Sequence, residues 1–348
     1  DDVIKVNLEP DGSVKSLSTK NTGELTADLY IDCTGFAALL LDKALKVPFI
    51  NYNKELINDR AVVTHIPYIN PEIEMESVTN CIALESGWAW NIPLWNKIGK
   101  GYVYSSKFAS KKEAEIQFRK HLASKNMVIS DKGRAENAEF RHIKIRHGAH
   151  ETSWKHNIVG IGLASGFIEP LESTGLMLTH ENVLFLIRTL KRRNGLVNRF
   201  DIDSFNFSVQ DTIERFRQFV SQHYALSGRR DTPYWKHVTE EIVYDNVTAK
   251  FEKPKHPNPL NNSFVDLAFR LNQSRNLDIT MGGLPYIAAG MGYNPVNISE
   301  VHDENNWKET KTKYEKHRAE TQLFIDKMPS HYQFLKDNLY KDTTPPPT

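Results

Sequence analysis

Alternating apolar and polar residues dominate the start of the chain and predict β-strands. Residues 3–8 and 14–17 alternate on either side of an Asp-Gly turn, and residues 25–33 follow a second turn. This order predicts a β-meander. The third strand runs into a small-residue corner and the apolar segment 37–45, which is typical of nucleotide-binding folds.

Further strand patterns lie between residues 60 and 106 and predict an antiparallel sheet with many aromatic side chains. They cover residues 61–66, 77–82, 87–93 and 101–105. Residues 111–123 place apolar side chains at helical spacing, so a helix is expected after the sheet.

A strand, a small-residue turn and a helix are predicted next. Residues 157–163 form the strand pattern, and the turn 164–175 opens into the helical pattern 176–191. This geometry presents backbone N–H groups to an anion. A second helix is expected over 205–225, followed by a mostly helical remainder in which residues 253–262, KPKHPNPLNN, predict a loop.

The composition indicates a folded protein with a sizeable core. The chain has 348 residues, 40% of them hydrophobic, and its 44 basic residues nearly balance its 43 acidic ones, which argues against nucleic acid as a partner. Cys33 and Cys81 are too few for a disulfide framework and lie in no metal-ligand spacing, so we expect a reducing cytoplasm and no metal site. No apolar run approaches the roughly 20 residues that span a membrane.

The strongest chemical signal is the segment 160–175, which reads GIGLASGFIEPLESTG. It places an acidic residue, Glu172, just before a helix whose first N–H groups suit an anion or a group that gains negative charge. An alternative interpretation is that Glu172, Ser173 and Thr174 only cap that helix.

A second motif pairs two tryptophans on one face of a strand. Residues 88–93 read WAWNIP, and residues 101–106 read GYVYSS. Taken alone, alternating tryptophans are equally well explained by core packing.

Both motifs, together with the segment ADLYIDCTGF at residues 27–36, resemble flavin-dependent halogenases of the tryptophan halogenase family in sequence and in order. The resemblance implies an α/β fold with α+β elements. We expect the FAD/NAD(P)-binding fold of flavoprotein monooxygenases, with an antiparallel substrate-side sheet and a mostly helical C-terminal part. The expected divisions are a partial FAD-binding domain at 1–45, the sheet at 46–150, the FAD and halide strand-turn-helix at 151–195, and a helical substrate-side subdomain at 196–348.

The resemblance also assigns expected roles to individual residues. Glu172 matches the family's catalytic glutamate, and the backbone at Thr174 and Gly175 matches its halide site. The active-site wall that shields the flavin from substrate corresponds to Trp88, Trp90 and Pro93. The residues expected along the FAD are Thr34, Gly35, Gly162, Leu163 and Leu176.

The implied reaction uses FAD, which a separate NADH-dependent flavin reductase supplies in reduced form. Reduced FAD, oxygen and chloride, bromide or iodide give hypohalous acid, which halogenates an electron-rich arene. Two alternatives stay open: a related FAD-dependent aromatic monooxygenase, which WAWNIP argues against, and a non-catalytic flavoprotein-derived module. A homo-oligomer is compatible with either.

Two expected family features have no counterpart in the sequence. No G-x-G-x-x-G follows a first strand, and no segment matches the context of the lysine that carries the hypohalous acid equivalent. Because the sequence opens on Asp1 and enters a strand pattern at once, we expect it to begin within a domain.

The substrate is predicted from residues 278–297. Dedicated tryptophan halogenases place aromatic residues and an ammonium-binding glutamate there, whereas this segment has Tyr286 and Tyr293 but no tryptophan, and no acidic residue after Met281. This favours a free-standing indole, phenol or similar small arene over tryptophan. The segment 223–235, which also resembles the family, is assigned no chemistry.

Overall fold

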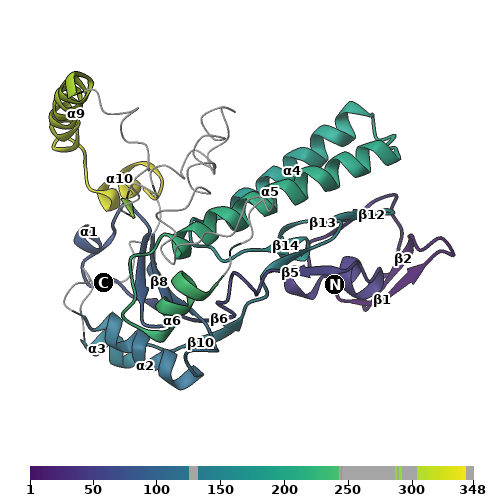
Figure 1. The fold of residues 1–348 in the computed structure, drawn as a ribbon. Coiled ribbons are helices and arrows are strands. Elements are labelled where there is room, and N and C mark those ends of the chain that lie inside the picture. The colour runs from purple at the N-terminus through teal and green to yellow at the C-terminus, as the bar shows by residue number, and fades with distance from the viewer. Residues whose placement is uncertain (125–131, 243, 245–286, 288–289, 292–303, 342–348) are drawn as a thin grey trace.

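The computed structural model describes residues 1–124, 132–242, 244, 287, 290–291 and 304–341 (Figure 1). Strands β1 and β2 lie at one end of the molecule, and the helices α9 and α10 lie at the opposite end. A long pair of helices, α4 and α5, bridges the two parts. The predicted loop 253–262 lies outside the described residues, as does nearly all of the segment 278–297.

The predicted meander is present but its third strand is split. Strands β1 (Val3–Leu8), β2 (Val14–Thr19) and β3 (Gly23–Leu25) form an antiparallel sheet. Strand β4 (Tyr30–Asp32) leaves the meander and pairs in parallel with β13 (Ile158–Gly160), which also pairs with β12 (Trp154–Lys155). The prediction of one strand over 25–33 was wrong because the segment divides between two sheets. Its first residue, Leu25, pairs with β2, whereas Tyr30 and Asp32 are buried where β4 pairs with β13.

Short helical turns follow the parallel strands at their carboxyl ends. After β4 come η1 (Gly35–Ala37) and the π-helix η2 (Leu39–Ala44). The apolar segment noted at 37–45 forms most of these two turns. After β13 comes η3 (Gly162–Ala164), because Gly162 has a φ of 67° that turns the chain out of the strand. The strand predicted at 157–163 is therefore shorter.

An antiparallel sheet of five strands is the largest sheet in the described part of the chain and confirms the sheet predicted at 60–106. Its order is β10 (Arg141–Lys144), β6 (Arg60–Ile66), β9 (Lys97–Tyr104), β8 (Gly87–Leu94) and β7 (Asn80–Leu84). Strand β9 begins earlier than predicted because the tight β8–β9 turn pairs Lys97 with Leu94.

Two hydrophobic cores cover the two faces of this sheet. Alternation along β8 and β9 sends Trp88, Trp90 and Val103 to the front face, which packs against α4 (Thr174–Arg192) and α5 (Arg199–Ala225). The back face carries Tyr102 and packs against α2 (Lys111–Leu122) and α3 (Lys132–Asn137).

Three further strands join the two parts of the molecule. Strand β11 (Gly148–His150) pairs with β5 (Phe49–Asn51) on one side and with β14 (Gly166–Phe167) on the other. Strand β14 leads directly into the turn that precedes α4.

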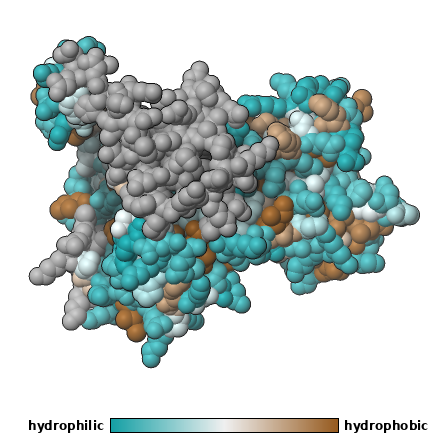
Figure 2. All heavy atoms as spheres, viewed as in Figure 1, coloured by the Kyte–Doolittle hydropathy of each residue, from teal (hydrophilic) through white to brown (hydrophobic). Residues whose placement is uncertain are grey.

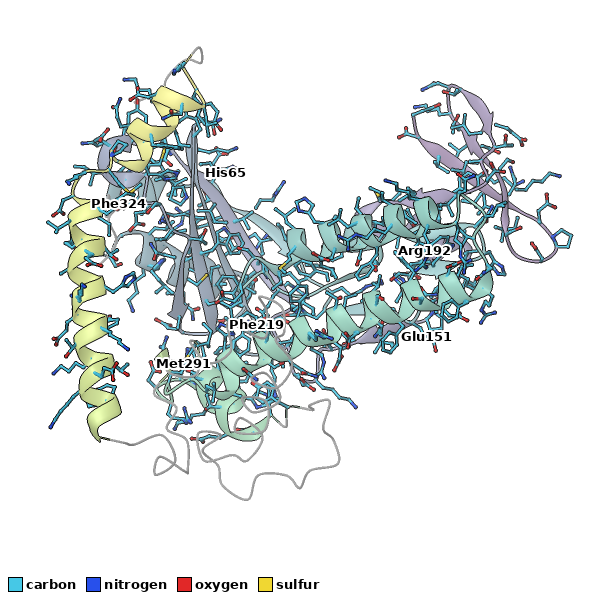
Figure 3. The ribbon with its side chains drawn as sticks, turned by 90° about the horizontal axis from the view of Figure 1, so that it is seen from above. His65, Glu151, Arg192, Phe219, Met291 and Phe324 are labelled. Carbon is cyan, nitrogen blue, oxygen red and sulfur yellow. The ribbon has the colours of Figure 1, made fainter. Side chains whose placement is uncertain are left out.

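Helices α4 and α5 run side by side when seen from above (Figure 3). Helix α5 begins before the predicted residue 205, because Asn198 and Asp201 form a capping box there. Asp201 is buried and paired with Arg192 and Arg193 at the end of α4, which closes the hairpin.

The other helices are short or lie at the periphery. They are α1 (Pro71–Glu74), α6 (Pro233–Lys236), the π-helix η4 (His237–Glu241), α9 (Glu304–Ile325) and α10 (His331–Asn338). Helix α9 stands apart from the rest in Figure 3. No described helix is long and apolar enough to cross a membrane.

Candidate functional site

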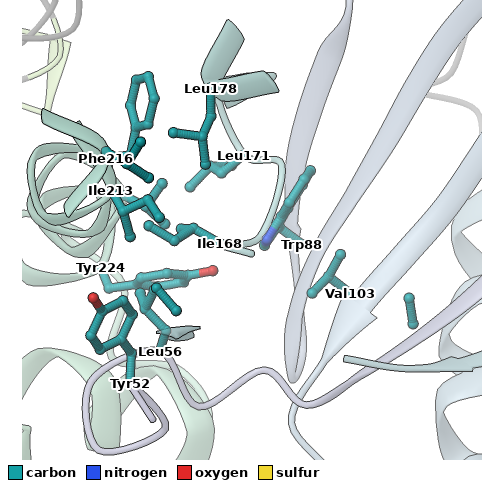
Figure 4. Close-up of a cluster of buried hydrophobic side chains, with 14 of the residues drawn as sticks. Tyr52, Leu56, Trp88, Val103, Ile168, Leu171, Leu178, Ile213, Phe216 and Tyr224 are labelled. Atoms are coloured by element: carbon teal, nitrogen blue, oxygen red, sulfur yellow. The ribbon is translucent and has the colours of Figure 1, made fainter. Parts of the chain in front are cut away.

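The turn between β14 and α4 places two glutamates on opposite sides of one loop. Ile168 and Leu171 are buried in the front-face core and hold the turn in place (Figure 4). Glu169 is fully buried, whereas 38% of the Glu172 side chain is exposed. The sequence EPLESTG, residues 169–175, therefore presents one carboxylate to the core and one toward the surface.

Glu169 accepts hydrogen bonds from two neutral donors. The indole N–H of Trp88 lies 2.9 Å from Oε2, and the amide Nδ2 of Asn58 lies 3.0 Å from the same oxygen. The second oxygen, Oε1, has no hydrogen-bond partner among the described residues. A buried carboxylate relies on such donors, because burial without them is costly. Glu169 therefore ties the turn before α4 to the strand that carries the tryptophans.

Asn58 is the centre of this buried network. Its Nδ2 also donates to the hydroxyl of Tyr224 at 2.8 Å, and its Oδ1 accepts from the hydroxyl of Tyr234 at 3.0 Å. His147 donates from Nε2 to the Asn58 carbonyl at 2.6 Å, since its Nδ1 accepts from the backbone N–H of Glu169. Burial lowers the pKa of His147, which keeps its ring neutral. The indole nitrogen and the Tyr224 hydroxyl face the same space in Figure 4.

Trp88 and Trp90 lie next to each other on the front face, as the alternation predicts. Their ring centroids are 6.0 Å apart. Trp90 lies over Gly101 of the neighbouring strand, where a Cβ atom would be only 2.1 Å from the indole ring. The glycine of GYVYSS is therefore what lets Trp90 lie flat on the sheet. Pro93 alternates to the back face of β8 and pairs with Ile98, so it does not lie beside the two tryptophans.

Glu172 is held by a histidine from the far end of α5. Its Oε1 lies 2.9 Å from Nε2 of His223, and the other ring nitrogen of His223 lies 2.9 Å from the carbonyl of Phe219. Cys81 of β7 faces Glu172. Packing around Cys81 and the negative charge of Glu172 raise the pKa of that thiol to about 11, although part of the residue reaches the surface. Cys81 pairs across the strands with Trp90, so Glu172 lies near the tryptophan pair.

The start of α4 has no side-chain cap. Ser173 occupies the cap position in a left-handed conformation, with φ 57°, and its side chain makes no capping hydrogen bond. The capping interpretation of Ser173 therefore finds no support. A Cβ atom at Gly175 would meet nothing within 4 Å, and Leu176 is 75% exposed. The first N–H groups of α4, at Thr174 and Gly175, therefore have no side-chain cap, and the space beside Gly175 is open although Thr174 itself is buried.

The other predicted FAD contacts come together at the carboxyl ends of the parallel strands. The turn η3, which contains Gly162 and Leu163, contacts both η1 and α4. The buried carboxylate of Asp32 shapes the facing turn by accepting hydrogen bonds from Thr34 and from the N–H groups that begin η2. Leu163 stays 39% exposed, so an apolar side chain is available at this corner.

Reasoning from the sequence missed the buried network and the partner of Glu172. Asn58 and His147 lie in segments without a motif, and nothing in their spacing connects them to residue 169. His223 and Tyr224 lie in a segment noted for its resemblance, and a helical projection places them at the buried end of α5. The apolar pattern at that end of the helix, which predicts burial, is the signal that could have directed attention to them.

Known proteins match nearly the entire chain. Residues 1–288 match the family described as tryptophan halogenase. The tryptophan 6-halogenase SttH of Streptomyces toxytricini is 32% identical over 96% of this chain and 60% of its own length. Three curated relatives match nearly all of this chain, and the chain spans about 60% of the length of each of them.

Solved structures agree in fold. The VirX1 structure superposes with a TM-score of 0.82 at 38% identity, covering 99% of this chain and 65% of that one. Tar14, a tryptophan C-6 flavin-dependent halogenase, gives a TM-score of 0.76 at 28% identity, covering 96% and 62%. The predicted flavoprotein fold class is therefore confirmed. With the family match over residues 1–288, these likenesses show that the chain belongs to the tryptophan halogenase family.

Proposed function

We propose that this chain forms the greater part of an FAD-dependent halogenase that acts on an electron-rich arene. The observation that carries the proposal is the convergence of Glu172, the Trp88–Trp90 pair and the uncapped start of α4. These groups come from two separate segments, strand β8 and the turn that leads into α4, and the hydrogen bond from Trp88 to Glu169 holds the two segments together.

The residues present fit a halide and a flavin. The uncapped N–H groups at Thr174 and Gly175 and the positive end of α4 suit an anion. Exposed Leu163 and Leu176 offer apolar surface to a ring system, while Thr34, Gly35 and Gly162 form the turns at the adjacent strand ends. When bound, reduced FAD and oxygen supply the oxidising equivalent that turns chloride, bromide or iodide into hypohalous acid.

The chain's own side chains would direct that oxidant. Trp88 and Trp90 would separate the flavin side from the arene, so that halide and not substrate meets the oxidant. Glu172 would accept the proton that leaves the arene carbon when the carbon–halogen bond has formed. Holding one ring carbon in place would set the position of halogenation by proximity.

The proposed substrate is a free-standing indole, phenol or similar small arene. SttH is named as a tryptophan 6-halogenase, but residues 282–297 of this chain contain no acidic residue that could bind an ammonium group. A separate NADH-dependent flavin reductase is the proposed partner, and the cytoplasm is the proposed location.

An assay of the complete gene product tests this function. It would contain FAD, a flavin reductase, NADH, oxygen, one halide at a time and a panel of arenes, with products read by mass spectrometry. We expect a halogen mass shift. A shift of one oxygen atom would instead identify a monooxygenase, and oxidation of NADH without any modified arene across the panel would count against the halogenase.

A further inference from the structure

The contact between Glu172 and His223 contains one proton that the geometry fixes. The Phe219 carbonyl can only accept, so the 2.9 Å contact from Nδ1 of His223 requires a proton on Nδ1. A neutral ring then has only a lone pair at Nε2, which faces a carboxylate oxygen at 2.9 Å. Two acceptors do not approach that closely, so a second proton lies between Nε2 and Glu172.

The ends of two helices decide which partner carries that proton. His223 lies in the last turn of α5, a helix of 27 residues, where unpaired carbonyls favour a cation. Glu172 directly precedes the cap residue of α4, where unpaired N–H groups favour an anion. The partial exposure of Glu172 also lets water stabilise a carboxylate. Both helices therefore favour a carboxylate beside an imidazolium.

We propose that His223 is a positioning residue that carries a resident proton as an imidazolium and holds Glu172 as a carboxylate. This inference rests on the proposed function for its catalytic consequence. Oε1 of Glu172 is occupied by His223, and no described residue hydrogen-bonds to Oε2. Oε2 is therefore the oxygen that faces an incoming proton.

The pair also resolves an electrostatic conflict. Glu172 lies within three residues of Thr174 and Gly175, so an isolated carboxylate would repel the halide expected at the start of α4. The imidazolium offsets that charge. Among the described residues, the charge of Glu172 also acts on Cys81, whose raised pKa keeps the thiol neutral. The Phe219 ring packs edge-on against His223 and adds no charge.

The proton step balances in this arrangement. The arene carbon loses its hydrogen as a proton, the electron pair of the C–H bond returns to the ring, and an O–H bond forms at Oε2 of Glu172. His223 keeps its proton throughout, and solvent removes the new proton from the exposed carboxyl afterwards.

NMR of the chain with ¹⁵N-labelled histidine tests the proton location without any cofactor. Near neutral pH we expect both ring nitrogens of His223 to be protonated, with the signal assigned by its loss in His223→Gln. Glu172→Gln should leave only one of them protonated. His142, whose Nε2 lies 2.6 Å from Glu115 at the far edge of the five-stranded sheet, is the matched pair that should not change. A singly protonated His223 in the unaltered chain would overturn the proposal.

Kinetics of the complete gene product tests the consequence. Glutamine can donate to Glu172 but cannot titrate, so His223→Gln should keep the KM for the arene, lower kcat about tenfold or less and remove the alkaline fall of the kcat profile. His223→Leu should lower kcat more and raise the KM for halide, and His142→Gln should change neither. An unaltered pH profile in His223→Gln would contradict the positioning role. Failure of the unaltered enzyme to halogenate would refute the proposed function, while the NMR result would stand on its own.

Discussion

The two faces of the five-stranded sheet bury ionisable groups in opposite ways. On the front face Glu169 is surrounded by neutral donors that it shares with Trp88 and Asn58. On the back face Lys100 is 2% exposed and lies near charged groups, among them Glu76, Glu74 and Arg134. Burial lowers the pKa of Lys100 to about 8. The same two strands, β8 and β9, thus supply a pre-formed network on one side and a weakly solvated cation on the other.

This contrast also excludes Lys100 as the lysine that the family resemblance requires. Lys100 pairs with Asn91, whose side chain points away from the tryptophans. Because successive residues of a strand alternate between faces, no small adjustment brings Lys100 to the front.

The largest expected effect lies at Glu172. In the complete gene product, Glu172→Gln removes the proton acceptor and should reduce halogenation by about 10²-fold or more, while flavin reoxidation continues. Product yield and NADH consumption measured together would show this. Unchanged yield would remove Glu172 from the mechanism.

A second prediction concerns the indole that binds Glu169. Trp88→Phe leaves a buried carboxylate with one donor fewer and should lower the free energy of unfolding by about 2–3 kcal/mol beyond the effect of the smaller ring. Trp154→Phe is the control, because Trp154 is equally buried but donates to the neutral carbonyl of His156. Equal losses in urea denaturation would mean that the front-face network adds nothing.

A third prediction tests the close approach at Gly101. Gly101→Ala places a methyl group 2.1 Å from the Trp90 ring and should cost about 2 kcal/mol of stability through overpacking, with a change in tryptophan fluorescence. Gly99→Ala on the same strand meets its nearest atom at 3.6 Å and should be tolerated. If both variants behave alike, the glycine does not position Trp90.

The smallest effect is expected on the back face. The unfolded chain keeps the Lys100 proton up to a pKa of about 10.4, whereas the folded chain releases it near pH 8, so stability rises with pH between these values. Lys100→Met should remove that rise and increase the free energy of unfolding near neutral pH by about 1 kcal/mol. The exposed Lys15→Met serves as control in denaturation series across this pH range. If stability still rises with pH to the same extent in Lys100→Met and in Lys15→Met, Lys100 is well solvated.

The sequence predicted those features that depend on local pattern. Alternation in WAWNIP placed Trp88 and Trp90 on one face, and the small-residue turn before residue 176 placed Glu172 at a helix start. The same alternation also separates Pro93, an odd number of residues away, from the tryptophans, so the expectation that Pro93 shares their wall came from the family resemblance and not from the pattern.

Long-range contacts could not be predicted. Asn58 meets Glu169 and Tyr224 only after three distant segments have folded, and none of the three carries a spacing that reports the others. The split of the third strand has the same origin, because β4 is defined by its partner β13 and not by its own residues.

The parallel pairing of β4 with β13 has a kinetic consequence. Tyr30 pairs with Ile158, and the entire five-stranded sheet lies between them in the sequence. Closing so long a loop is entropically costly, whereas the β8–β9 hairpin needs only a tight turn. We therefore expect the five-stranded sheet to form early in folding and β4 to pair with β13 late. The corner beside Leu163 and the start of α4 would then be the last part of the molecule to become ordered.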